Sequence, residues 1–226
     1  MEELFEGHER DAMIVEGVVI GIVTDNKDPD NLGRIKVKYP VLDQTLESGW
    51  ARMITFMAGK DRGGYFLPEV NDEVLVSFEF GNINHPYVLG ALWNGVDTPP
   101  LNNANGENNI REIKSRSGHI FKFDDKSGDE QIEIIDKTGN NKIRISSKDN
   151  TITIETAKDI VLKAPQGTIT LEANQIKIKA TTELSMTSSG TGKLETTASL
   201  AVKSSAIADV EASGIMNIKG SLINLN

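Results

Sequence analysis

The sequence contains no cysteine among its 226 residues. This absence excludes disulfide bonds, thiolate metal sites and cysteine nucleophiles, and it leaves the redox compartment open. Aromatic residues make up only 5 % of the chain, and there are three histidines. With 38 % hydrophobic residues, a large single core is not expected, and the length suits one or two domains.

Long apolar runs and basic segments are also missing. No stretch approaches the roughly 20 apolar residues of a membrane helix. The N-terminal MEELFEGHERDAMIVEG lacks a basic region followed by an apolar run, so we expect cytoplasmic synthesis without a signal peptide. The net charge of -9 argues against nucleic acid as a partner.

Residues 13–95 have the pattern of a compact β-domain after an N-terminal arm, residues 1–12. Short alternating strands are separated by turn residues, and both tryptophans lie here. Expected strands cover 13–24, 34–39, 49–57, 73–80 and 87–93, with DNKDPDNLGR and AGKDRGG as loops. About five bent strands, with glycines where a sheet must coil, indicate an OB-like barrel.

A linker is expected over 96–110, where GVDTPPLNNANGENN is rich in proline, asparagine and glycine. Residues 111–226 then carry pairs of apolar residues at a repeat of about eight. A unit that short holds one strand with two side chains on one face, which cannot bury itself. We therefore predict an intertwined triple-stranded β-helix, in which each of three identical chains supplies one face per level.

The open alternative for this region is an antiparallel meander or a low-complexity tail. Regularly placed isoleucines argue against disorder. The predicted partner-binding tip is Leu222, Ile223 and Leu225. The predicted trimer core consists of Ile143, Ile145, Ile152, Ile154, Ile160, Leu162, Ile169, Leu171, Ile176 and Ile178.

Residues 21–95 resemble the OB-like domain shared by phage baseplate assembly protein V and the VgrG spike proteins of contractile injection systems. Asn71 departs from the usual glycine of that pattern and Asn82 from a common aspartate, and both suit tight turns. The matching positions are Asp28, Pro29, Leu32, Gly33, Arg34, Trp50, Arg52, Gly63, Gly64, Phe66, Pro68, Asp72, Glu73, Val74, Pro86, Val88, Gly90, Asn94 and Gly95.

The resemblance implies a structural central spike that is seated on a separate baseplate hub protein and pierces a target membrane. Assembly into a phage tail-like particle follows from the same resemblance. The C-terminal His-x-His iron site of some phage spikes is missing, so the resemblance implies a PAAR-like protein as the cap of the tip. The membrane would be contacted only transiently.

No catalytic, cofactor or metal residue is predicted. His85 and His119 lie outside any catalytic motif, DDKSGDE lacks the spacing of a calcium loop, and GKDRGG is not a Walker motif. The alternative function is a β-helical tailspike enzyme acting on carbohydrate, which needs a carboxylate pair beside aromatics. A nucleic-acid-binding OB-fold is disfavoured by the acidic balance.

Overall fold

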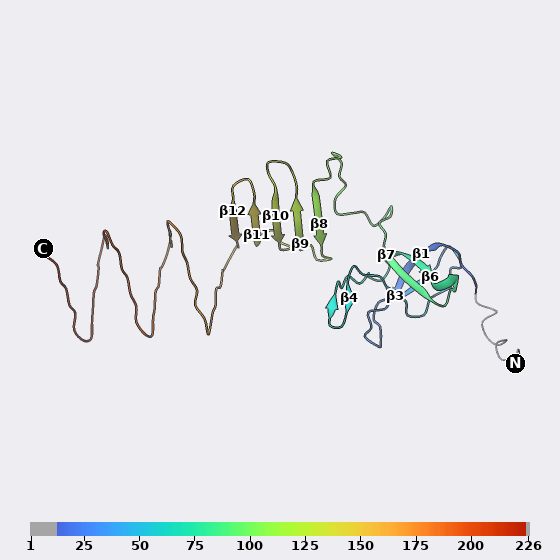
Figure 1. The fold of residues 1–226 in the computed structure, drawn as a ribbon, viewed down its shortest axis with the longest axis horizontal. Helices are drawn as coiled ribbons and strands as arrows, with labels where there is room; N and C mark the ends of the chain where they lie inside the picture. Colours follow the sequence, from blue (N-terminus) through green and yellow to red (C-terminus); the bar gives the residue numbers. More distant parts are fainter. Residues whose placement is uncertain (1–12, 225–226) are drawn as a thin grey trace. The chain divides into compact units, whose positions relative to one another are not determined.

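The structure is a computed structural model that describes residues 13–224, and within them every extended element is a β-strand (Figure 1). The predicted all-β class is confirmed. The described residues include a single turn of 3-10 helix, η1 (Glu79–Gly81), and no helix long or apolar enough to cross a membrane. The chain divides after Ile160 into two units. The predicted arm, 1–12, lies outside the described residues.

The N-terminal part of the described chain forms a five-stranded sheet with the strand order β2-β1-β6-β7-β3. Ile35, just before β2, pairs with Ala51, just before β3, through two backbone hydrogen bonds of 3.0 and 2.8 Å. This bridge joins the two edges of the sheet and closes the barrel. Its strands are β1 (Val18–Asp25), β2 (Lys36–Lys38), β3 (Arg52–Met53), β6 (Glu73–Phe78) and β7 (Pro86–Ala91).

The barrel core is small and mostly aliphatic. Alternate residues of β2 and β6 point inward, as the period of two in a strand requires, and Val37, Val74 and Val76 have no exposed area. Tyr39 is also fully buried and packs edge-on against Phe78, with ring centroids 5.5 Å apart.

The loop before β2 is built around one carboxylate. Asp28 accepts hydrogen bonds from the backbone N–H groups of Asp30, Leu32 and Arg34, and from two nitrogens of the Arg34 guanidinium at 2.8 and 2.7 Å. Gly33 has φ 69°, a backbone conformation that glycine adopts without steric cost, and so it permits the loop. The Arg34 guanidinium is therefore held within the loop by Asp28.

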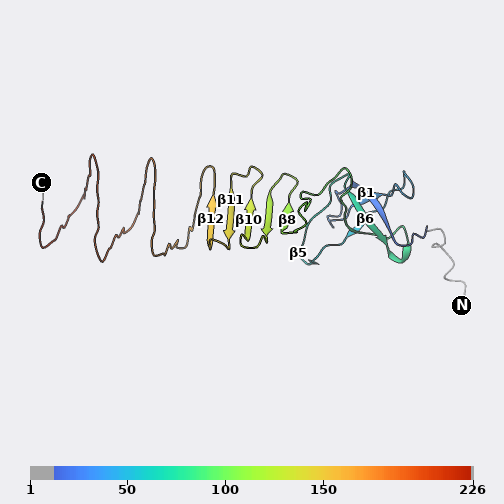
Figure 2. The same ribbon diagram turned by 90° about the horizontal axis from the view of Figure 1, so that it is seen from above.

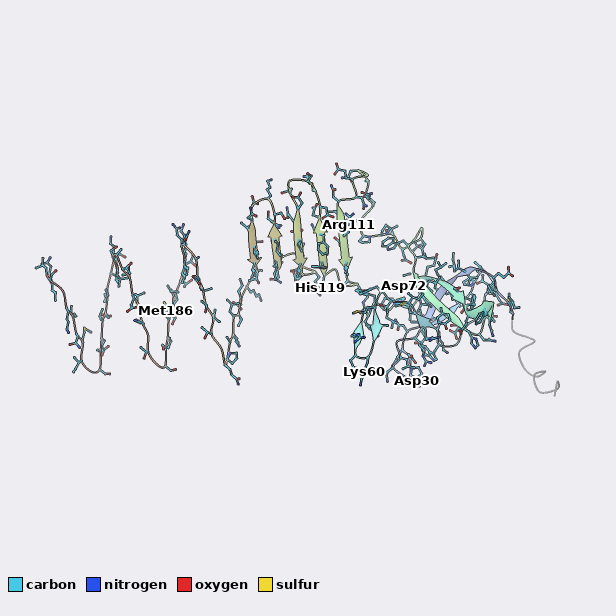
Figure 3. The ribbon with its side chains drawn as sticks, in the orientation of Figure 1. Asp30, Lys60, Asp72, Arg111, His119 and Met186 are labelled. Carbon is cyan, nitrogen blue, oxygen red and sulfur yellow. The ribbon has the colours of Figure 1, made fainter. Side chains whose placement is uncertain are left out.

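The AGKDRGG segment is a hairpin and not the expected open loop. Strands β4 (Ala58–Gly59) and β5 (Arg62–Gly63) pair across Lys60 and Asp61, and Figure 3 marks Lys60 at the turn. Asp61 has φ 55°, which its short polar side chain tolerates, so two residues suffice to reverse the chain.

A second five-stranded sheet follows, in which every strand is antiparallel to its neighbours and the order is β12-β11-β10-β9-β8. Figures 1 and 2 both show these strands side by side. The antiparallel-meander alternative therefore describes this part of the single chain. The strands are β8 (Ile110–Lys114), β9 (Ile120–Asp124), β10 (Gln131–Ile135), β11 (Lys142–Ser146) and β12 (Thr151–Glu155).

Residues 156–224 contain no paired strand, and the chain reverses direction at regular intervals (Figure 2). The reversals begin at residues 157, 165, 174, 181, 189, 197, 205, 213 and 221. All eight intervals lie within one residue of the predicted repeat of about eight, and the last five are each eight residues. Figure 3 shows the side chains of this segment, Met186 among them, projecting from a chain without neighbours.

Candidate assembly interface

One face of the meander carries two parallel rows of apolar side chains. Backbone register places Phe123, Ile132, Ile145 and Ile152 directly opposite one another across four strands. The second row is Ile113, Phe121, Ile134, Ile143 and Ile154, across all five strands. Because residues of each strand that differ by two point to the same face, both rows share it.

This apolar face, defined as the nine residues of the two rows, is open to solvent in the single chain. Its members are 36–71 % exposed, with Ile152 the most exposed. A groove of about 1040 Å³ lies along its second row and reaches Ile160. Contiguous exposed apolar surface of this kind is typical of binding surfaces, protein–protein interfaces among them.

The opposite face of the meander is polar and ordered by ion pairs. Glu133 is 5 % exposed and lies between Lys122 Nζ at 2.5 Å and Arg144 Nε at 2.9 Å. Burial acts to raise the pKa of Glu133, but its hydrogen bonds to Lys122 and Arg144 outweigh burial and hold the pKa below its ordinary value. The polar face is thus satisfied within one chain, whereas the apolar face is not.

The predicted core residues fall into two groups in the structure. Ile143, Ile145, Ile152 and Ile154 are brought together on the apolar face. Their role as a trimer core stays a prediction. The other six lie beyond β12, on segments without a paired strand, and are 51–67 % exposed: Ile160, Leu162, Ile169, Leu171, Ile176 and Ile178.

Side-chain hydroxyls mark many of the reversals, and sequence reasoning missed them. The Ser188, Thr196 and Ser204 oxygens each accept from the backbone N–H two residues on, at 3.2–3.4 Å, and donate to the carbonyl three residues on. Such local bonds are typical of serine and threonine turns. The signal was available, because these hydroxyl residues are spaced by eight.

The predicted tip is only partly visible. Leu222 is 77 % exposed and Ile223 is 46 % exposed, so both have apolar surface free for a partner. Leu225 lies outside the described residues.

The residues considered above for catalysis or metal binding form local ion pairs and hydrogen bonds in the structure. In DDKSGDE, Asp125 pairs with Arg111 at 3.2 Å and Asp129 with Lys148 at 3.6 Å. Across residues 13–224, no three carboxylates or histidines converge as a metal site would require. His119 Nδ1 accepts from the backbone N–H of Lys137 at 3.2 Å, which ties two turns of the meander together.

Acidic groups beside the groove are similarly engaged. Glu155 pairs with Lys142 Nζ at 2.6 Å, and Asp136 accepts from Thr138 and from the backbone of Asn141. The apolar groove therefore suits a protein surface better than a sugar, and the tailspike enzyme is not favoured.

Comparison with known proteins identifies the barrel. Residues 19–93 match the family described as the type VI secretion system/phage-baseplate injector OB domain. The match contains all five barrel strands except the first residue of β1, so the predicted OB-like fold is confirmed.

Curated relatives match a longer part of the chain. The type VI secretion system spike protein VgrG1a of Pseudomonas aeruginosa is 30 % identical over 128 residues, which cover 52 % of this chain and 20 % of the relative. Spike protein VgrG3 of Vibrio cholerae is 29 % identical over 113 residues, covering 46 % and 11 %. The actin cross-linking toxin VgrG1 of Vibrio cholerae is 27 % identical over 111 residues, covering 46 % and 10 %. The chain thus spans a fifth or less of these relatives.

Proposed function

Because residues 19–93 carry the injector OB domain and the chain is related to the VgrG-type baseplate spike proteins, we propose that three copies form the central spike of a contractile injection system. The observation that carries this proposal is the two-row apolar face, which a single chain leaves exposed. Beyond the meander, the chain reverses about every eight residues, and these units likewise need neighbouring copies to bury their apolar side chains.

Strand length supports three copies. A strand of five residues is about 17 Å long, and three such faces arranged as a triangular prism lie about 5 Å from the common axis. That distance is half of the spacing of about 10 Å between two sheets packed face to face. Four faces would stand about 8.5 Å from the axis and leave a void. Two copies packed face to face would leave the apolar rows open to water along both sides.

Thrust would be carried by the backbone ladder. In the meander, hydrogen bonds between strands run in the direction in which the strands succeed one another, perpendicular to each strand. A prism built by continuing this succession has its hydrogen bonds along its axis. Compression during sheath contraction would then act on many backbone bonds in parallel and on a dry apolar interior.

The proposed partners follow from the relationship to spike proteins. The barrel would seat the spike on a baseplate hub, and a PAAR-like protein would cap the C-terminal tip. Leu222 and Ile223 offer the exposed apolar surface that a cap requires. The target membrane would be met transiently during injection, and the role would be mechanical and not enzymatic.

The mass of the native particle tests the proposal. We expect native mass spectrometry of the purified chain to give three times the chain mass of 24.7 kDa, because three faces are needed to close the apolar interior.

A variant with the apolar face made polar, Ile132→Ser with Ile145→Ser, provides the control and should be monomeric. A well-folded wild-type monomer would contradict the proposal.

A further inference from the structure

Phe80 is held in solvent by a disfavoured backbone. It is the middle residue of η1, directly after β6, with φ 50° and ψ 28°. A bulky residue in this left-handed region is rare, because its Cβ crowds the backbone. The ring nevertheless packs against no other side chain within residues 13–224, since the residue is 99 % exposed.

Two further exposed apolar side chains lie on the segment that pairs with the residues after Phe80. The segment before β1 pairs with the segment after Phe80, since Val15 N–H donates to the Gly81 carbonyl at 2.8 Å and Ile14 lies opposite Asn82. Ile14 is 73 % exposed and Met13 is 51 % exposed. We call Phe80, Ile14 and Met13 the Phe80 knob.

The knob has an acidic border. Glu79 precedes Phe80, and Glu16 follows the paired segment; both are exposed. The Tyr87 hydroxyl donates to Glu79 Oε2 at 3.3 Å. Exposed aromatics at interface centres contribute most of the binding free energy, and bordering charges select the partner.

We propose that the Phe80 knob docks into an apolar pocket, bordered by lysine or arginine, on a baseplate protein other than this chain. This rests on the proposed spike function. A second copy is the less suitable occupant, because identical knobs meeting about a threefold axis would bring Glu16 and Glu79 of the copies together. The unfavourable backbone of Phe80 is then compensated only in the assembled baseplate.

The first test separates docking from folding. Asparagine tolerates the left-handed region, so Phe80→Asn removes the ring while relieving strain. We expect an unchanged or higher thermal midpoint and an intact trimer. The amount of chain in particles purified from producing cells should nevertheless fall at least about tenfold.

Val41→Asn is the matched control. Val41 is 63 % exposed on the same domain and is not one of the three knob residues, and its variant should be incorporated normally. Normal incorporation of Phe80→Asn would overturn the proposal and leave the spike function standing. Absence of the wild-type chain from the particles would instead overturn the spike function.

The second test identifies the occupant. Since the chain has no cysteine, Phe80→Cys introduces a single thiol. We expect rapid maleimide labelling in the isolated trimer and labelling slower by at least about tenfold in the particle. Val41→Cys should label equally in both. Protection of Phe80→Cys already in the isolated trimer would assign the knob to a second copy and overturn the proposal.

Discussion

A single carboxylate organises the loop that leads into β2. Asp28 is 8 % exposed and accepts from three backbone N–H groups as well as from Arg34. The Arg34 guanidinium, helped by these N–H groups, holds the pKa of Asp28 far below its usual range, although burial acts in the opposite direction. The loop therefore depends on the ionised form.

Asp28→Asn should destabilise the barrel at neutral pH. The amide has only one acceptor oxygen, so it cannot accept hydrogen bonds from both guanidinium nitrogens of Arg34 and from the three backbone N–H groups as the carboxylate does. The folded-state pKa is lowered, so the stabilisation is present above the unfolded value of about 3.9 and is lost as pH falls toward the folded value. We expect the thermal midpoint of the variant to lie several degrees below wild type at pH 7.

The same difference should shrink steadily below about pH 4. Asp30→Asn is the control: its carboxylate also contacts Arg34, at 2.6 Å, but its side chain is 66 % exposed, so its effect should be small. A difference between wild type and Asp28→Asn that did not change with pH would contradict the role of the ionised carboxylate.

For single residues, the sequence predicts backbone conformation better than it predicts which charged side chains pair. The positive φ of Gly33 follows from the LGR turn, because glycine is the residue that accepts it. The pairing of Asp28 with Arg34 was missed because charged residues are usually solvated, and only the folded loop brings the two within 2.7 Å. Phe80 at positive φ could not be foreseen either, since no local preference favours it.

At the scale of elements, the meander separates its two faces cleanly. Ile154 and Thr153 are neighbours on β12 that point to opposite faces: Ile154 ends the second apolar row, while Thr153 lies opposite Arg144 on the polar face. This pair offers a matched comparison of the two faces in one strand.

Ile154→Asp together with Ile169→Asp should prevent assembly, because the trimer would hold three unpaired carboxylates at each of two levels. Each buried unpaired charge is expected to cost about 3 kcal/mol or more. Thr153→Asp should leave the native mass unchanged. Trimers of Ile154→Asp/Ile169→Asp with a normal thermal midpoint would show that the apolar rows are not the core.

The spacing of the reversals gives a second prediction for the elements. Deleting residues 197–204 removes one repeat and leaves Thr196 before the next reversal at Ser205 and Ala206. We expect this variant to form trimers that resist protease. Deleting only 197–200 shifts every later reversal against the apolar pattern, and should yield chains that protease cleaves near the deletion. Equal protease resistance of the two would count against the eight-residue unit.

Elements were predictable where hydrophobic alternation was strong. β6 was expected within a few residues, and the apolar pairs Ile143/Ile145 and Ile152/Ile154 lie on β11 and β12, because branched residues alternate in each of these strands. Expected strand 49–57 is reduced to β3, two residues long, since its partner β7 runs parallel and pairs only there. β8 and β9 were not among the expected strands, because charged residues dilute their alternation.

For the whole molecule, the single chain buries apolar side chains in the barrel and leaves most of the others exposed. The barrel has a closed core of its own, with Val23, Ile35 and Val88 fully buried. Beyond Glu155, every residue of the described chain but two is largely exposed, apolar ones included. The eight-residue periodicity could be read from the sequence, whereas the number of chains depends on contacts that one chain does not contain.

The eight-residue spacing of the reversals also has a consequence for the gene. Each unit corresponds to a segment of 24 bases, since three bases encode a residue, and successive segments encode similar peptides. Unequal recombination among them would lengthen or shorten the protein by whole units, each adding about 4.8 Å of reach if neighbouring units are spaced as paired strands. For the proposed spike, a change in the number of units would change the reach of the needle and leave the barrel unaltered.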